Sequence, residues 1–136
     1  MQYFLAKTDP DTYHIDQFEK DKKTCWDGVR NAQAIQAIKA MKPGDTIFIY
    51  HSMGMAAIVG FAKAISVPRP SPTDVKSWVI DLEFKGRLEP NATLREIKES
   101  ELFADWALVR QSRLSTMPVP ENFVAWMKQK YPKAKF

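Results

Sequence analysis

The chain is poor in the residues that carry common catalytic, redox and phosphate-binding chemistry. Its 136 residues include one cysteine, two histidines and five glycines. A single cysteine excludes an internal disulfide and is typical of a reducing compartment. None of the glycines lies in GxGxxG or GxxxxGK spacing, which argues against nucleoside triphosphate hydrolysis and against dinucleotide cofactors. We therefore expect no cofactor.

Metal sites and membrane spans are equally poorly supported. Neither His14 nor His51 lies in an HxxxH or CxxC context, so we expect no metal site. No apolar stretch approaches the ~18 residues that span a bilayer. The first residues also lack the basic region and long apolar run of a signal peptide. We expect a protein of the cytoplasm, or of the nucleus in a eukaryotic host, with no membrane partner.

The composition is that of a globular domain with a mild excess of positive charge. Hydrophobic residues make up 45% and aromatic residues 12%, enough for a core without disulfides or metals. We expect a single domain over residues 1–136. A net charge of +4 is a weak bias toward polyanions and is not typical of a high-affinity, nonspecific nucleic-acid binder. The oligomeric state stays open.

Hydrophobic patterning predicts an α+β fold. Period-two alternation and apolar runs favour strands, while helical spacing, caps and prolines favour short helices. We expect strands at residues 2–7, around Cys25, at 46–51, 57–67 and 78–85, and helices at 15–20, 32–41, 93–100 and 120–130. The resulting architecture is a small mixed β-barrel flanked by short helices.

The densest polar motif runs from Trp26 to Asn31 and surrounds Gly28 with an indole, an acid, a guanidinium and an amide. An indole can stack on a flat heteroaromatic ring, and the polar groups can pair with its edge or with a phosphate. The alternative is a hydrophobic anchor followed by an Asp-Gly turn and an asparagine helix cap. The motif alone leaves both interpretations open.

Further polar clusters follow apolar segments. Arg110 and Arg113 share a face if they lie in one helical turn, and together they could clamp a phosphate; the alternative is a surface turn with structural ion pairs. Ser52 closes a polar triplet after the most apolar strand, where side chains often face a pocket mouth. Lys7, at the end of the first strand, could also meet a phosphate.

Two catalytic hypotheses are weaker. Cys25, His51 and Asp27 could assemble a nucleophile, although a buried, inert thiol is the commoner case. His51 could alternatively act as a general base on a small nucleotide, but no second acid or base is evident beside it.

Five separated motifs together resemble the EVE domain family, which includes the thymocyte nuclear proteins. They occupy residues 7–10, 26–31, 41–45, 50–52 and 109–115, and the resemblance extends over nearly the whole chain. The family belongs to the PUA-like superfamily and is related to the YTH readers of methylated adenine. The resemblance therefore implies a PUA-like barrel with a pocket for one modified base.

The function implied by the resemblance is a reader rather than a catalyst, most strongly for 5-methyl- or 5-hydroxymethylcytosine in DNA. The alternative is a PUA-like module that binds a modified base in RNA. We expect the base to lie between Trp26 and the Leu114 region, with Asp27 fixing the turn, and we expect Trp26→Ala to leave the fold intact. The expected base-binding residues are Trp26, Asn31, Ser52, Gln111, Ser112 and Leu114, and the expected phosphate-binding residues are Lys7, Arg30, Arg110 and Arg113.

Overall fold

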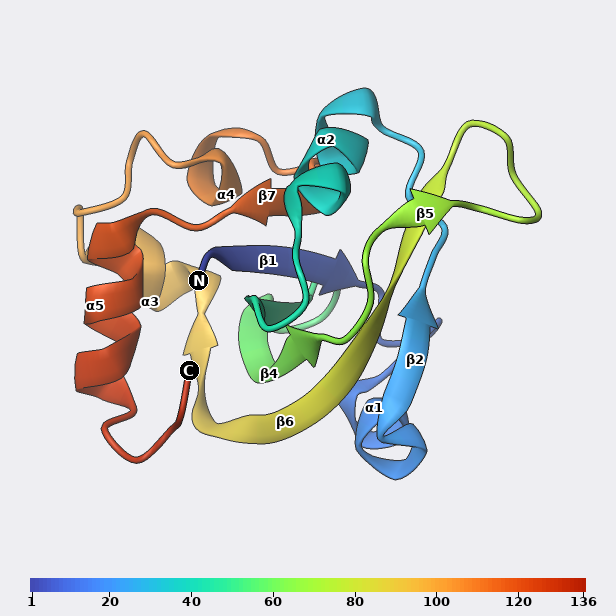
Figure 1. Cartoon of the computed structure of the whole chain (residues 1–136). Helices are drawn as coiled ribbons and strands as arrows, with labels where there is room; N and C mark the ends of the chain where they lie inside the picture. The colour runs from blue at the N-terminus through green and yellow to red at the C-terminus, as the bar shows by residue number, and fades with distance from the viewer.

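A curved seven-stranded mixed sheet with five short helices around it makes up the computed structural model, which describes residues 1–136 (Figure 1). The strands are β1 (Tyr3–Thr8), β2 (Lys23–Trp26), β3 (Thr46–His51), β4 (Ala57–Ala64), β5 (Arg69–Pro70), β6 (Trp78–Thr93) and β7 (Thr116–Pro118). The helices are α1 (Ile15–Asp21), α2 (Ala32–Ala40), α3 (Leu94–Glu99), α4 (Ala107–Arg110) and α5 (Glu121–Lys130). The expected α+β class is confirmed.

The strand order is β2-β6-β4-β3-β1-β7, with β5 paired to the start of β6. Strands β1 and β3 are parallel, whereas the other pairs are antiparallel. The outer strands β2 and β7 do not pair with each other, so the curved sheet stays open where a closed barrel would join them. Because β1 and β3 are parallel, their C-terminal residues Thr8 and His51 lie side by side at the same end of the sheet.

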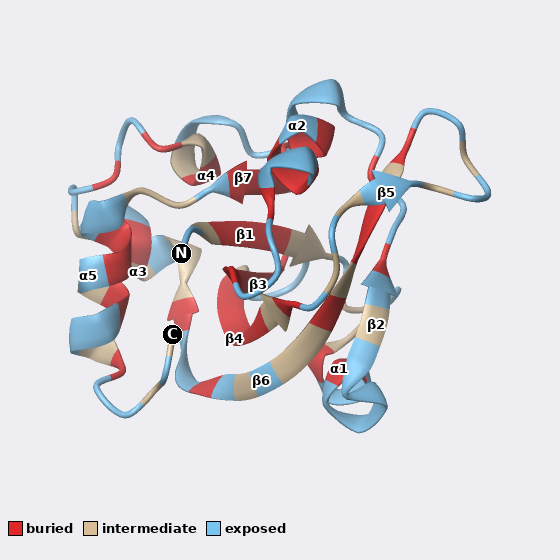
Figure 2. Cartoon of the chain, viewed as in Figure 1, coloured by how far each residue is buried: buried red, intermediate tan, exposed pale blue.

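The hydrophobic core consists of 35 buried residues that come from both the strands and the helices. All six residues of β3 are buried, as its apolar run predicted, and Figure 2 shows burial concentrated in the central strands while the outer faces of the helices are exposed. Helix α1 approaches the sheet closely at Gly60 of β4. A Cβ there would lie 2.9 Å from Cδ1 of Ile15 and 2.7 Å from the carbonyl oxygen of Gly86. Glycine at this position therefore lets α1 dock beside the end of β3.

Several segments differ from the sequence predictions. Strand β6 continues to Thr93, beyond the alternation that predicted it, because its residues 82–93 pair with β4. Strand β4 ends at Ala64 instead of residue 67, and the short strands β5 and β7 and the short helix α4 were not predicted. No helix has the length and apolarity that a membrane crossing requires.

Candidate functional site

A cavity of about 300 Å³ opens beside the C-terminal end of β1. Three segments form it: the end of β1, the turn before α1, and β2 with the residue that follows. Its lining residues are Lys7, Thr8, Thr12, Tyr13, Thr24, Cys25, Trp26 and Asp27. This volume is at the lower end of the ~300–1,000 Å³ range of small-ligand pockets, so one ring-sized group fits it better than an extended ligand.

Two aromatic rings form the firm wall of this cavity. The indole of Trp26 meets the ring of Tyr13 edge to face, with centroids 6.2 Å apart and planes at 77°. The same indole packs against Phe18 and is only 7% exposed. Trp26 is thus both a pocket wall and a core residue, which contradicts our expectation that its truncation would leave the fold unchanged.

Lys7 connects the cavity to the loop that follows α4. Its ammonium donates a hydrogen bond to the carbonyl oxygen of Ser112 at 3.0 Å and lies 5.4 Å from the centre of the Tyr50 ring. The backbone N–H of Lys7 donates to the carbonyl oxygen of Ser115 at 2.7 Å. Desolvation by the surrounding protein lowers the pKa of Lys7. Motifs from the beginning, middle and end of the chain therefore meet at this edge.

The residues of the loop after α4 differ in their burial and in their partners. Gln111 is the C-cap of α4, Leu114 is buried in the core, and Arg113 is exposed beside Ser112 with no ion-pair partner. Because α4 ends at Arg110, the two arginines do not share a helical turn, and the expected clamp is wrong in that respect. Arg110 instead lies 3.8 Å from the carboxylate of Asp105.

The second half of the tryptophan motif lies outside the cavity lining. Arg30 pairs with Asp74 at 2.8 Å. The side-chain oxygen of Asn31 accepts hydrogen bonds from the backbone N–H groups of Gln33 and Ala34, so it caps α2. The turn-and-cap interpretation therefore describes these two residues.

Asp27 behaves differently from the turn-fixing role expected for it. Its carboxylate makes no hydrogen bond to the turn and no ion pair, although it lines the cavity. The turn is made by Gly28, whose φ of +78° lies in the left-handed region that glycine adopts readily. Asp27 thus leaves a free acceptor at the pocket, whereas its sequence neighbours are used within the fold.

Sequence reasoning did not identify Thr12, Tyr13 or Thr24 as pocket residues. Tyr13 lies in the polar turn before α1 and donates a hydrogen bond from its hydroxyl to Asp21 at 2.8 Å. A single aromatic in a polar turn was the one available signal.

The polar triplet at residues 50–52, at the C-terminal end of β3, supports the site without lining it. The backbone N–H of Ser52 donates to the carbonyl oxygen of Thr8 at 3.0 Å. His51 is buried, and its Nε2 accepts a hydrogen bond from the backbone N–H of Ile15 at 3.1 Å. The imidazole therefore fixes the start of α1, which carries the turn with Tyr13.

Stability should fall with acidification because of His51. Burial, and to a smaller extent the nearby imidazole of His14, lowers the pKa of His51 below its ordinary 6.5. As the pH falls below 6.5, His51 takes up a proton in the unfolded chain before it does so in the folded one, so the free energy of unfolding decreases until the lowered pKa is reached. Denaturant titrations at about pH 7.5 and about pH 5.5 measure this decrease.

His51→Gln is the matched variant, because a glutamine oxygen can accept from the Ile15 N–H but does not titrate. It should lose part of the pH dependence while keeping the fold. An equal slope in both chains would show that His51 does not carry the effect.

The thiol of Cys25 is exposed, contrary to the buried, inert thiol considered above. Its Sγ lies 3.7 Å from the guanidinium of Arg69. Desolvation raises the pKa of Cys25 and outweighs the opposing effect of Arg69. The imidazole of His51 is bonded to α1, so these residues do not form the nucleophilic arrangement considered from the sequence.

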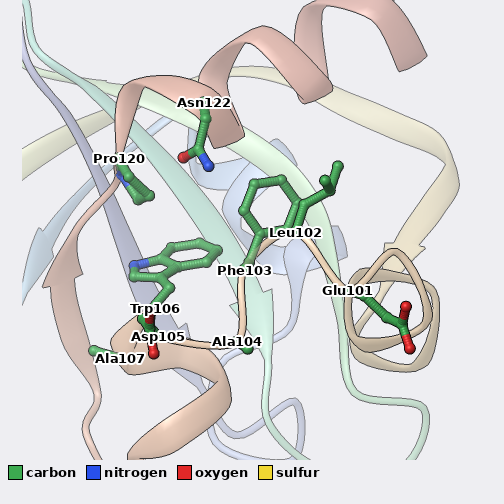
Figure 3. A pocket seen from close by; sticks show the side chains of 9 residues that line it. All are labelled: Glu101, Leu102, Phe103, Ala104, Asp105, Trp106, Ala107, Pro120 and Asn122. Atoms are coloured by element: carbon green, nitrogen blue, oxygen red, sulfur yellow. The ribbon is translucent and has the colours of Figure 1, made fainter.

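A larger cavity, of about 500 Å³, lies between the α3–α4 connection and the start of α5. In Figure 3 the indole of Trp106 and the amide of Asn122 face this space, whereas the carboxylate of Glu101 lies apart. The Trp106 indole N–H donates to the carbonyl oxygen of Pro118, which ties this ring to the fold. The charged lining residues are acidic, so this cavity is a poor site for an anionic ligand. No cluster of three or more His, Cys, Asp or Glu side chains could hold a metal ion.

Fold and site together define a small α+β domain with an aromatic-walled polar pocket beside the C-terminal end of β1. The chain belongs to the EVE domain family, whose model matches residues 2–129. Thymocyte nuclear protein 1 of Rattus norvegicus is 30% identical over an alignment that covers 71% of this chain and 55% of that protein. The chain thus spans about half the length of most of the curated relatives it matches.

Solved structures share the whole fold. Rpa0253 from Rhodopseudomonas palustris has a TM-score of 0.90 and 32% identity, with coverage of 100% of this chain and 97% of that one. Human THYN1, solved in complex with DNA containing 5-methylcytosine, has a TM-score of 0.86 and 23% identity, with coverage of 98% and 100%.

Proposed function

We propose that this chain binds DNA and holds one modified cytosine, 5-methyl- or 5-hydroxymethylcytosine, in the cavity between Tyr13, Trp26 and Asp27. The observation that carries the proposal is the combination of a base-sized volume, a fixed aromatic wall and a free carboxylate. A carboxylate can accept a hydrogen bond from the exocyclic amino group of cytosine, which is a standard contact for this base.

The energetics of base capture show what the pocket must supply. Taking a base out of a duplex costs a few kcal/mol, and one stacking contact returns ~1–3 kcal/mol. Stacking therefore offsets the extraction without distinguishing one base from another. Discrimination must come from the base edge and from contacts to the added group at its carbon 5. Asp27 is our candidate for the edge, and Trp26 with the methyl groups of Thr12 and Thr24 is our candidate surface for the added group.

The family supports a nucleic-acid ligand. A human relative, 26% identical over 96% of this chain, is thymocyte nuclear protein 1, and human THYN1 has been crystallised with DNA containing 5-methylcytosine. The transfer of that ligand to this chain is our proposal. A DNA ligand also agrees with the cytoplasmic or nuclear location expected from the lone cysteine.

We propose binding without catalysis. Two imidazoles lie together at the end of β3, with ring centroids 4.7 Å apart: His51 is buried with its Nε2 engaged by the Ile15 N–H, and Nδ1 of His14 accepts a hydrogen bond from the Asp16 N–H. The exposed thiol nearby has a raised pKa, which disfavours the reactive thiolate.

Fluorescence polarisation at one fixed, moderate salt concentration tests the proposal. Matched DNA and RNA oligonucleotides would carry plain, 5-methylated or 5-hydroxymethylated cytosine, or N6-methylated adenine, at one position. We expect tighter binding to DNA with a modified cytosine than to the plain sequence. A preference confined to RNA would establish the alternative RNA-binding module, and equal weak binding to every oligonucleotide would refute a modified-base pocket.

Arg113 should add affinity that does not depend on the base. It is exposed beside Ser112, whose carbonyl oxygen holds Lys7 at the pocket, and no acid neutralises it. Arg113→Ala should therefore weaken binding to plain and modified DNA alike and reduce the slope of log affinity against log salt by about 1.

The matched control is Lys42→Ala. Lys42 is an exposed cation before β3, at the end of that strand opposite to the pocket. It should leave both the affinity and the salt slope unchanged. A salt slope in Arg113→Ala equal to that of the parent chain would exclude a phosphate contact.

A further inference from the structure

An exposed apolar loop emerges beside the pocket. Residues 52–56, which we call the methionine loop, connect β3 to β4. Met53 is 58% exposed and Met55 is 73% exposed, and Gly54 between them has a φ of +71°. Two flexible apolar side chains are thus held in solvent on either side of a tight turn. No other part of the fold covers these two side chains, so their exposure serves no packing role within the domain.

The methionine loop begins at the pocket wall. The N–H of Ser52 bonds to the carbonyl oxygen of Thr8 at 3.0 Å, and the hydroxyl of Thr8 donates to the carbonyl oxygen of Tyr13 at 3.0 Å. Consecutive Cα atoms are ~3.8 Å apart, so Met53 lies one such step from Ser52 and Met55 at most three steps. The methionine loop is therefore close enough to the cavity to contact the base pairs next to a nucleotide bound there.

Cations lie on the far side of the loop. Met55 borders a shallow hollow that it shares with Arg95, Lys98 and Glu99 of α3; Arg95 pairs there with Glu99 at 2.8 Å, so Lys98 is the cation without an ion-pair partner. The N–H of Leu94 donates a hydrogen bond to the carbonyl oxygen of Ala56 at 2.9 Å, which holds α3 beside the loop. An apolar projection between a base-sized pocket and an unpaired cation matches a duplex in the order of its parts: captured base, base stack, phosphate backbone. Proteins that distort DNA commonly insert methionine or other apolar side chains between bases.

We propose that the methionine loop is a wedge, in which Met53 and Met55 enter the duplex and fill the space left by the base that the pocket takes up. This inference rests on the proposed function, because a wedge is needed only when a base leaves a stack. A flexible, polarisable side chain suits the irregular gap between an orphaned partner base and its neighbours. Lys98 then holds a phosphate next to the opened step.

The test compares duplex with single-stranded DNA for the parent chain and for the double variant Met53→Ser, Met55→Ser. Both DNA forms carry the same single 5-methylcytosine. A single strand requires no unpairing, so the wedge contributes to duplex binding alone. We expect the double variant to bind the duplex at least tenfold more weakly and to bind the single strand within about twofold of the parent chain. Leu102→Ser, at a 62% exposed apolar residue on the α3–α4 connection, is the matched control and should change neither.

A second duplex, with a mismatch opposite the 5-methylcytosine, tests whether the lost affinity reflects the cost of opening the base pair. A weakened pair costs less to open, so the mismatch should restore most of the affinity that the double variant lost. Equal losses on single strand and duplex, or no loss on either, would overturn the wedge. A parent chain that does not distinguish 5-methylcytosine from cytosine in single strands would instead refute the proposed function itself.

Discussion

Trp26→Ala should destabilise the chain by about 3–5 kcal/mol, the usual cost of truncating a buried tryptophan to alanine. The indole is 7% exposed and packs against Tyr13 and Phe18 at the junction of α1 and β2. Its removal opens a cavity among aromatic rings that other contacts hold in place. Because whole domains are stable by only about 5–15 kcal/mol, a loss of this size removes much of the margin.

Urea unfolding followed by far-UV circular dichroism measures the loss without relying on tryptophan fluorescence. Trp78→Ala is the matched control, because Trp78 is half-buried at the start of β6, with the ammonium of Lys39 4.6 Å from its ring. It should cost less than Trp26→Ala. Trp26→Phe should keep the fold, which makes it the variant for testing the pocket. If Trp26→Ala unfolds at the same urea concentration as the parent chain, the indole is not part of the core.

Local patterns predicted most of the sheet because the order of apolar and polar residues along a strand indicates which of its faces are buried. The apolar run at residues 46–51 is β3 with the same bounds, and the alternation that begins at Trp78 opens β6. The continuation of β6 could not be predicted in this way. Residues 86–93 include Gly86 and Pro90 and lack clear alternation, and their conformation depends on pairing with β4.

The candidate site was predictable only in part, because neighbours in sequence are not always neighbours in space. Trp26 and Asp27 line the cavity, but the turn at Gly28 carries Arg30 and Asn31 away to an ion pair and a helix cap. Tyr13 joins the site through the packing of α1 against β2, a contact that no local pattern encodes. The link between Lys7 and Ser112 is equally remote in sequence. The family resemblance predicts that those two motifs belong to one site, and their assignment to a ligand site stays a prediction.

Asp27→Ala should abolish the preference for 5-methylcytosine over thymine. These two bases share the 5-methyl group and differ where cytosine presents an amino donor and thymine a carbonyl acceptor. A free carboxylate at the pocket accepts from the former and repels the latter. One good edge contact is worth about 1–3 kcal/mol, so the parent chain should favour 5-methylcytosine by about 5- to 150-fold. The variant should bind both bases with nearly equal affinity.

The readout must be the ratio of the two affinities, measured on single strands that carry either base at one position. Removing a negative charge reduces the repulsion of phosphates on both oligonucleotides equally, whereas the loss of the edge contact weakens binding of 5-methylcytosine alone, so only the ratio isolates the edge contact. Asp105→Ala removes an exposed carboxylate from the cavity beside Trp106 and should leave the ratio unchanged. Asp27→Asn should lower the ratio as well, because its amide can donate to the thymine carbonyl. A ratio that stays at the parental value in Asp27→Ala would assign base discrimination to another group.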